Sequence, residues 1–105
     1  MPDLDRTSAD YCVSRLKAIA DTTRWSVMVL LNGRAMTAGA LQAAIGIDPT
    51  LLSHHLKILK QSGLAIGRRH GREVTYSLAE GVRLDNGQAG FDLGCCSILF
   101  AESLS

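Results

Sequence analysis

The spacing of the apolar residues changes at Gly63, and this change restricts the possible fold more than any other feature of the chain. The fifteen residues before it contain leucines at the interval of a helix with one buried side: Leu52, Leu56 and Leu59. After it, apolar and polar residues alternate as in a strand that is buried on one face: Val74, Tyr76 and Leu78. The pattern therefore predicts a helix followed at once by a β-hairpin that turns at His70-Gly71.

Three further helices are predicted upstream, over residues 9–20, 22–31 and 37–45. Their boundaries follow from residues typical of helix ends, namely Thr7 or Ser8, Asp21, Asn32-Gly33, Thr37 and Gly46. Asp48 caps the helix that carries the leucines, and Pro49 fits its first position. The tight turn at residues 46–48 makes the last two helices a helix-turn-helix, and the hairpin is its wing.

The predicted fold class is mainly α with a small β part (α+β), a winged helix-turn-helix that forms a homodimer. With 105 residues, the chain is one domain by length. The helix-turn-helix covers about 37–62, the wing about 64–79, and a tail for sensing and dimerisation about 80–105. Strand-like segments at 91–93 and 97–100 favour a second small hairpin in the tail, with one or two helical turns over 98–104 as the alternative.

Positive charge is concentrated in the predicted recognition helix and wing. The net charge of the chain is only +1, but the segment from Pro49 to Arg72 contains five lysines and arginines, all three histidines and no acidic residue. Such a local excess is typical of a surface that binds phosphate. His55 lies nearer the leucine side than His54, so packing or anchoring of a phosphate suits it better than base reading. The candidate DNA-binding residues are Thr50, Ser53, His54, His55, Lys57, Lys60, Arg68, Arg69 and Arg72.

Other classes of protein are disfavoured. An enzyme is not expected, because the chain has no paired carboxylates on one element, no phosphate loop and no nucleophile–base pair. No apolar run reaches the 18 residues of a membrane span, and the polar N-terminus does not resemble a signal peptide. We therefore expect a cytoplasmic location, where the three cysteines would be free thiols or metal ligands rather than disulfides.

Three motifs resemble the ArsR/SmtB family of winged-helix repressors, in the order and spacing of that family. The first is Leu16-Lys17-Ala18-Ile19-Ala20-Asp21-x-Thr23-Arg24, with Thr22 where the family usually has proline. The others are Ser53-His54-His55-Leu56-Lys57-x-Leu59-x-x-x-Gly63-Leu64 and Arg68-Arg69-His70-Gly71-Arg72-x-Val74-x-Tyr76-x-Leu78. The resemblance covers residues 15 to 79. It implies a homodimeric repressor that holds double-stranded operator DNA and is released by a metal or redox inducer.

The inducer site is where the chain departs from the better-known members of this family. Thr37 and Gly39 occupy the positions of the Cys-x-Cys pair found in many arsenic-responsive members, and the tail has no histidine for a zinc site. Some arsenite-responsive relatives have an adjacent cysteine pair near the C-terminus, which Cys95-Cys96 resembles, and others use cysteines of the first helix, where Cys12 lies. The resemblance thus implies As(III) or Sb(III) as inducer, with no organic cofactor.

Three thiolates suit As(III) and Sb(III), which prefer a pyramid of sulfur ligands. Adjacent side chains on a regular strand point to opposite faces, so a chelating Cys95-Cys96 pair needs a bend, which Gly94 permits. Cys12 is the candidate third ligand, from the same or the partner subunit. With only two ligands, a thiol-redox or persulfide-responsive repressor becomes the better interpretation. A non-sensing winged-helix interaction module is the remaining alternative, and buried apolar packing is the alternative role for all three cysteines.

Overall fold

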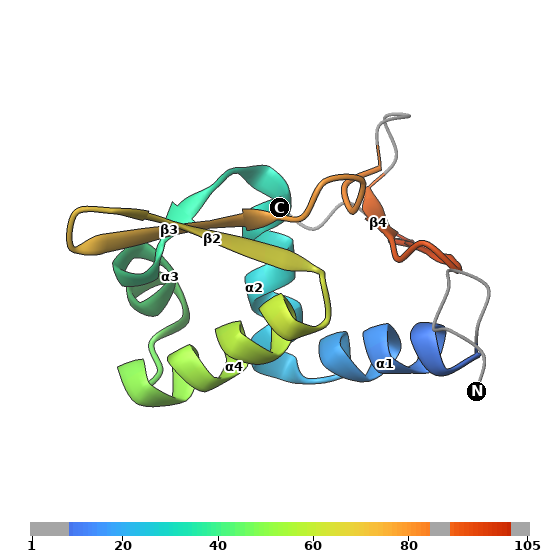
Figure 1. Cartoon of the computed structure of the whole chain (residues 1–105), viewed down its shortest axis with the longest axis horizontal. Helices are drawn as coiled ribbons and strands as arrows, with labels where there is room; N and C mark the ends of the chain where they lie inside the picture. The colour runs from blue at the N-terminus through green and yellow to red at the C-terminus, as the bar shows by residue number, and fades with distance from the viewer. Residues whose placement is uncertain (1–8, 85–88, 102–105) are drawn as a thin grey trace.

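The computed structural model describes residues 9–84 and 89–101, and within them it contains four helices and five strands (Figure 1). The helices are α1 (Ala9–Ile19), α2 (Thr22–Gly33), α3 (Ala38–Ile45) and α4 (Pro49–Gln61). The strands are β1 (Met36–Thr37), β2 (Ala65–His70), β3 (Glu73–Leu78), β4 (Gly90–Asp92) and β5 (Ser97–Leu99). The predicted mainly helical winged helix-turn-helix is confirmed.

The helix boundaries agree with the predicted capping residues. The Asp21 carboxylate accepts a hydrogen bond from the Arg24 amide at 3.0 Å, and the Thr37 hydroxyl accepts one from the Ala40 amide at 3.1 Å. Asp48 accepts from the amides of the first turn of α4. Each bond satisfies an N–H group that has no partner within its helix, which fixes where the helix begins. The cap predicted at Thr7 or Ser8 lies outside the described residues.

The core is built around α2, which runs through the middle of the molecule (Figure 1). Val27, Met28 and Leu31 of this helix have no exposed surface. The predicted leucine face of α4 packs into the same core and is buried throughout. Burial of one side of α4 leaves its opposite side directed to solvent.

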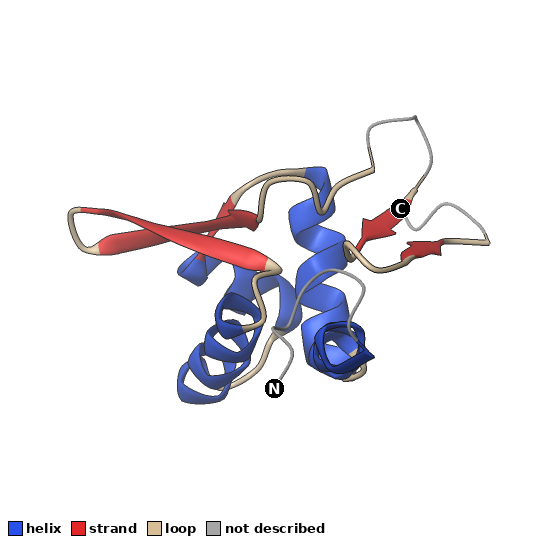
Figure 2. Cartoon of the chain, turned by 45° about the vertical axis from the view of Figure 1, so that its right-hand side comes forward, coloured by secondary structure: helices blue, strands red, loops and turns tan. Residues whose placement is uncertain are grey.

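The wing is an antiparallel hairpin of β2 and β3 that projects from one end of the molecule (Figures 1 and 2). Its register pairs His70 with Glu73 around the turn, in which Gly71 has a φ of 62°. The short strand β1 pairs with the other edge of β3 and was not predicted. Its two residues are too few to show an alternating pattern.

The tail forms a second hairpin, β4–β5, at the end of the molecule opposite the wing (Figure 1). The favoured interpretation of residues 91–100 is thus confirmed, and the helical alternative is wrong for the part of the tail that is described. Trp25 of α2 packs edge-on against Phe91 and Phe100, with ring centroids 5.6 and 5.5 Å away. This aromatic cluster attaches the tail to the first turn of α2. The expected turn at 85–87 lies outside the described residues.

Asp21 gives the fold a pH-dependent element. The hydrogen bond from the Arg24 amide, reinforced by the positive charge of Arg24, holds the pKa of this carboxyl below its ordinary value of 3.8. A lowered folded-state pKa stabilises the protein above the unfolded value, and this contribution is lost as the pH falls through the folded value. Thermal unfolding at pH 7 and near pH 3 should therefore show a smaller acid-induced loss for Asp21→Asn than for the wild type. Asp21→Ala, which removes the cap, should cost about 1 kcal/mol at pH 7.

Candidate DNA-binding surface and thiol cluster

The outward side of α4 presents polar and basic side chains to solvent. Its exposed residues include five of the predicted DNA-binding residues: Thr50, Ser53, His54, Lys57 and Lys60. The Lys60 ammonium also lies 5.9 Å from the centroid of the Tyr76 ring, so this lysine spans from α4 to the wing strand β3. A helix of this kind, buried on one side and cationic on the other, has the form of a helix that enters the major groove.

The wing carries the second group of cations. Arg68, Arg69 and Arg72 are all exposed, on both sides of the turn at Gly71. Glu73 is the first acidic residue after this turn, and it lies at the end of β3 that is closest to the tip. The guanidinium groups of a projecting hairpin are free to contact phosphates beside the groove that a recognition helix occupies.

His55 differs from the other candidates because it is buried, with 8% of its surface exposed. Its Nδ1 lies 2.9 Å from Nη1 of Arg24 and 3.7 Å from a carboxylate oxygen of Asp21. For this residue the structure favours packing inside the protein over base reading, and anchoring of a phosphate stays a prediction. His54, one residue earlier, is exposed on the side of Lys57.

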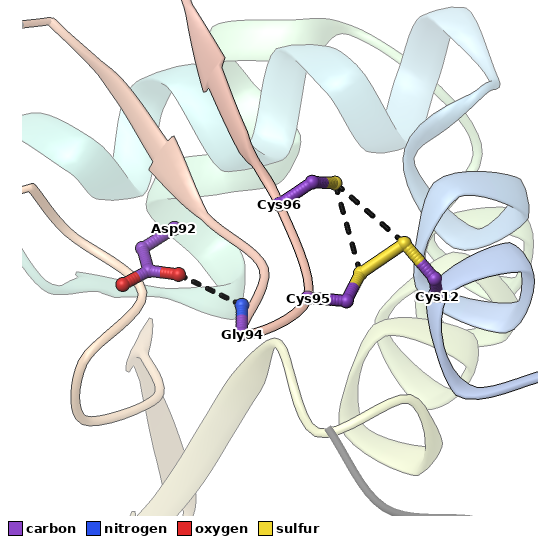
Figure 3. The surroundings of a disulfide bond; sticks show 5 residues. All are labelled: Cys12, Asp92, Gly94, Cys95 and Cys96. Carbon is purple, nitrogen blue, oxygen red and sulfur yellow. Dashed lines mark hydrogen bonds between the residues drawn. A yellow bond between two sulfur atoms is a disulfide. The ribbon is translucent and has the colours of Figure 1, made fainter. Parts of the chain in front are cut away.

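The three cysteines form one cluster, although Cys12 is 83 residues from Cys95 in the sequence (Figure 3). Cys12 comes from α1, and the adjacent pair comes from the turn between β4 and β5. Cys12 and Cys95 are joined by a disulfide, and the Sγ of Cys96 lies 3.7 Å from both of their sulfurs. All three side chains are partly buried.

The turn at Gly94 brings the adjacent cysteines to the same side. Gly94 has a φ of 91°, in the region that only glycine adopts readily, and its amide donates to the Asp92 carboxylate at 2.8 Å. The Leu93 amide donates to the Cys96 carbonyl, which closes the turn. The predicted bend before Cys95 is therefore present, and it lets Cys95 and Cys96 direct their sulfurs toward Cys12 (Figure 3).

One expectation about the cysteines needs correction. All three were expected to be free thiols or metal ligands rather than disulfides, but only Cys96 is free, because α1 and the tail turn bring Cys12 and Cys95 within bonding distance. The source of the third sulfur was left open between the same and the partner subunit, and the structure brings Cys12 to the tail of its own chain.

The geometry of the cluster is compatible with a single thiophilic ion once the disulfide is reduced. Two sulfurs bound to one ion through bonds of about 2.3 Å are at most about 4.6 Å apart. The sulfur of Cys96 already satisfies this limit toward both of its neighbours, at 3.7 Å. Reduction frees Cys12 and Cys95 to move apart to a similar distance, which gives three thiolates around one centre.

No local pattern in the sequence indicates the role of Arg24, which the structure places between three helices. This residue follows the Asp21 cap and looks like an ordinary first-turn residue of α2. Its side chain instead donates to the Ala18 and Lys17 carbonyls at the end of α1 and lies against His55 of α4. The position of His55 nearer the leucine side of its helix is the sequence feature that could have suggested a polar partner inside the protein.

Comparison with protein families identifies a match to the bacterial regulatory protein arsR family over residues 21–66. This region contains α2 to α4 and the start of the wing, and it excludes all three cysteines. Among curated proteins, the transcriptional repressor SdpR of Bacillus subtilis is 41% identical over 70 residues, covering 67% of this chain and 78% of that protein. The regulator NmtR of Mycobacterium tuberculosis is 35% identical over 75 residues, 71% of this chain and 62% of its own length. The repressor SmtB of the same organism is 38% identical, and the match spans 56% of it.

Solved structures give the same fold. HlyU from Vibrio cholerae superimposes with a TM-score of 0.66 at 28% identity, over 69% of this chain and 78% of HlyU. The homodimeric winged helix-turn-helix DNA-binding domain of Mb0332 from Mycobacterium bovis gives a TM-score of 0.64 at 31% identity, over 67% of this chain and 65% of that domain. No helix in the described part of the chain is long and apolar enough to cross a membrane.

Proposed function

The chain belongs to the ArsR family of bacterial regulatory proteins, and on that basis we propose that it is a repressor that releases operator DNA when As(III) or Sb(III) binds Cys12, Cys95 and Cys96. The family relationship makes it a DNA-binding transcriptional regulator and not an enzyme. We place the protein in the cytoplasm, where its DNA is.

The meeting of three sulfurs from two distant segments is the observation that carries the choice of inducer. The family match ends before the tail and begins after Cys12, so the cluster is a feature of this chain beyond the shared domain. Within the described residues it is also the only group of three or more cysteine, histidine or acidic side chains placed to hold a metal ion. Ligands that are all sulfur select soft, thiophilic ions over ions that prefer oxygen.

A homodimer supplies the two recognition helices that a repressor of this kind needs. The outer side of α1 exposes Val13 (46%) and Leu16 (37%), and β5 exposes Leu99 (53%). The exposed leucine and valine of α1 suit burial against a second copy, and the similar winged helix-turn-helix domain of Mb0332 is homodimeric. A symmetric pair would place two α4 helices on half-sites about 34–36 Å apart.

Release of DNA follows from the position of the cysteine cluster between α1 and the tail hairpin. Its sulfurs tie the first half of α1 to the tail hairpin, and both elements carry the apolar surface assigned to the dimer contact. Binding of an ion by all three thiolates resets the angle between them and so alters the spacing of the two α4 helices. The ion releases DNA only if it binds this arrangement more tightly than the DNA-bound one.

Loss of the proposed phosphate contacts is expected to weaken DNA binding and reduce its salt dependence. Each of Lys57→Ala and Arg69→Ala should lower the affinity for an operator duplex and flatten the slope of log K against log[salt] by roughly 0.9 per lost contact. Fluorescence anisotropy at several salt concentrations measures both quantities. Arg34→Ala, at an exposed site after α2, is the control and should bind as the wild type does. Unchanged slopes for Lys57→Ala and Arg69→Ala would exclude this DNA-binding surface.

A thiol-redox repressor is a second candidate function, favoured by the disulfide between Cys12 and Cys95. A peroxide would oxidise these two thiols to the disulfide and be reduced to water, with no metal involved. Disulfides of this kind in a reducing compartment are typically transient and regulatory. The two candidates are separated by treating the reduced protein–DNA complex with arsenite in one sample and with peroxide in another. Release of DNA in the peroxide sample but not in the arsenite sample would favour the redox function. Release in the arsenite sample but not in the peroxide sample would favour the proposed one.

A further inference from the structure

Arg24 contacts both the helix that carries Cys12 and the helix that faces DNA. Its Nε donates to the Ala18 carbonyl, and Nη2 donates to the Lys17 carbonyl at 3.5 Å, so the guanidinium caps the C-terminal end of α1. Nη1 of the same group lies 2.9 Å from Nδ1 of the buried His55 in α4. One planar side chain therefore fixes the end of α1 relative to the middle of the recognition helix.

The neighbouring residue contacts the tail. Trp25 packs against Phe91 of β4 and against Phe100, which follows β5, and these strands flank the turn that holds Cys95 and Cys96. The first turn of α2 is thus attached to the thiol cluster in two ways, through α1 and through the tail, and to α4 through His55. Asp21 holds this turn in place by capping α2 and lies 3.7 Å from His55.

We infer that Arg24 is the positioning residue that transmits the state of the thiol cluster to the recognition helix through His55. This inference rests on the proposed function, because it concerns how an inducer at the cysteines changes DNA binding. The two states are α1 with its thiols free and α1 tied to the tail through them. A shift of α1 moves the two carbonyl groups that Arg24 holds, and the rigid guanidinium passes this shift to His55, between the exposed His54 and the buried Leu56.

Arginine suits this role better than lysine because its planar fork donates in fixed directions to several acceptors at once. Arg24→Lys keeps the charge but cannot reach the carbonyls and His55 together. His55→Asn keeps an acceptor near the position of Nδ1, whereas His55→Leu removes it. Arg34→Lys, at an exposed site, is the matched control.

The test measures operator affinity of each variant, reduced and then saturated with arsenite, and counts bound arsenic per chain. The readout is the operator affinity of the reduced protein divided by its affinity with arsenite bound, and this ratio should be the same in the wild type and in Arg34→Lys. In Arg24→Lys and His55→Leu the number of arsenic atoms bound per chain should be unchanged, while the ratio falls at least tenfold toward one. His55→Asn should recover part of the wild-type ratio. Thermal unfolding followed by Trp25 fluorescence identifies any variant that fails to fold, in which case His55→Asn decides the result.

Two outcomes would overturn the inference. The first is a wild-type ratio in both Arg24→Lys and His55→Leu. The second concerns the DNA affinity of the reduced proteins. If the losses of DNA-binding free energy in Arg24→Lys and His55→Leu simply add in the double variant, the two residues do not act together. This second measurement needs no inducer. A wild type that binds arsenite and keeps its DNA affinity would refute the proposed function, while the double variant would still decide whether Arg24 positions α4 through His55.

Discussion

Serine in place of Cys12, Cys95 or Cys96, one at a time, is expected to leave operator binding nearly unchanged and to weaken release by arsenite strongly. Serine is close to cysteine in size, and the elements that carry the three residues, α1 and the β4–β5 hairpin, lie away from the wing (Figure 1). A site with two thiolates and a hydroxyl loses one of the three sulfur bonds that favour As(III). We expect the arsenite concentration for half-release to rise at least 100-fold in each variant. Anisotropy of a labelled operator duplex measures it.

The three single variants also separate the two candidate functions. Cys96 is outside the disulfide, so a redox repressor should still respond to peroxide in Cys96→Ser but lose its response in Cys12→Ser and Cys95→Ser. An arsenite sensor should lose its response to arsenite in all three. Undiminished release by arsenite from Cys95→Ser and Cys96→Ser would show that the inducer binds elsewhere.

A negative charge on the outer side of α1 is expected to break the dimer and with it the DNA affinity. Leu16→Glu places a carboxylate in the apolar surface assigned to the contact between subunits, where its desolvation is unfavourable. A dimer on two half-sites gains about 10²–10⁴-fold in affinity over a single domain, because the second contact is intramolecular. We therefore expect a loss of operator affinity in this range, together with a monomer in analytical ultracentrifugation.

Ser14→Glu is the matched control for this variant. It adds the same charge to an exposed site on the same helix, about 160° around its axis from Leu16, and removes no apolar surface. Its mass and DNA affinity should be those of the wild-type dimer. If Leu16→Glu remains dimeric and binds DNA normally, the subunits do not associate through this side of α1.

Local patterns were enough to predict the winged domain. The polar caps Asp21, Thr37 and Asp48 and the change of apolar spacing at Gly63 are short-range features, and each element they define is in place. The turn at Gly94 was predictable for the same reason, since a chelating adjacent pair needs a bend that glycine allows. These elements are predictable because the residues that define their ends and faces are close together in the sequence.

Contacts between distant segments were not predictable in this way. Cys12 was a candidate ligand, but nothing in its surroundings in the sequence shows that it meets the tail of its own chain. The contact of Arg24 with His55 joins residues 31 positions apart and depends on how α2 packs against α4. Helical angle alone placed His55 nearer the leucine side of α4, and only the structure shows its partners there, Arg24 and Asp21.

The most direct test of thiol-controlled repression is a titration of the reduced wild-type protein on its DNA. The duplex is one selected from a random pool by the reduced protein, and a phosphine is the reductant because dithiols would compete for the arsenic. Anisotropy and bound arsenic are recorded together as arsenite is added. We predict that the DNA is released with an end point at one arsenic per chain, as expected for one ion on three thiolates. Binding of arsenic without release, or equal release from the variant with serine at all three positions, would contradict the account.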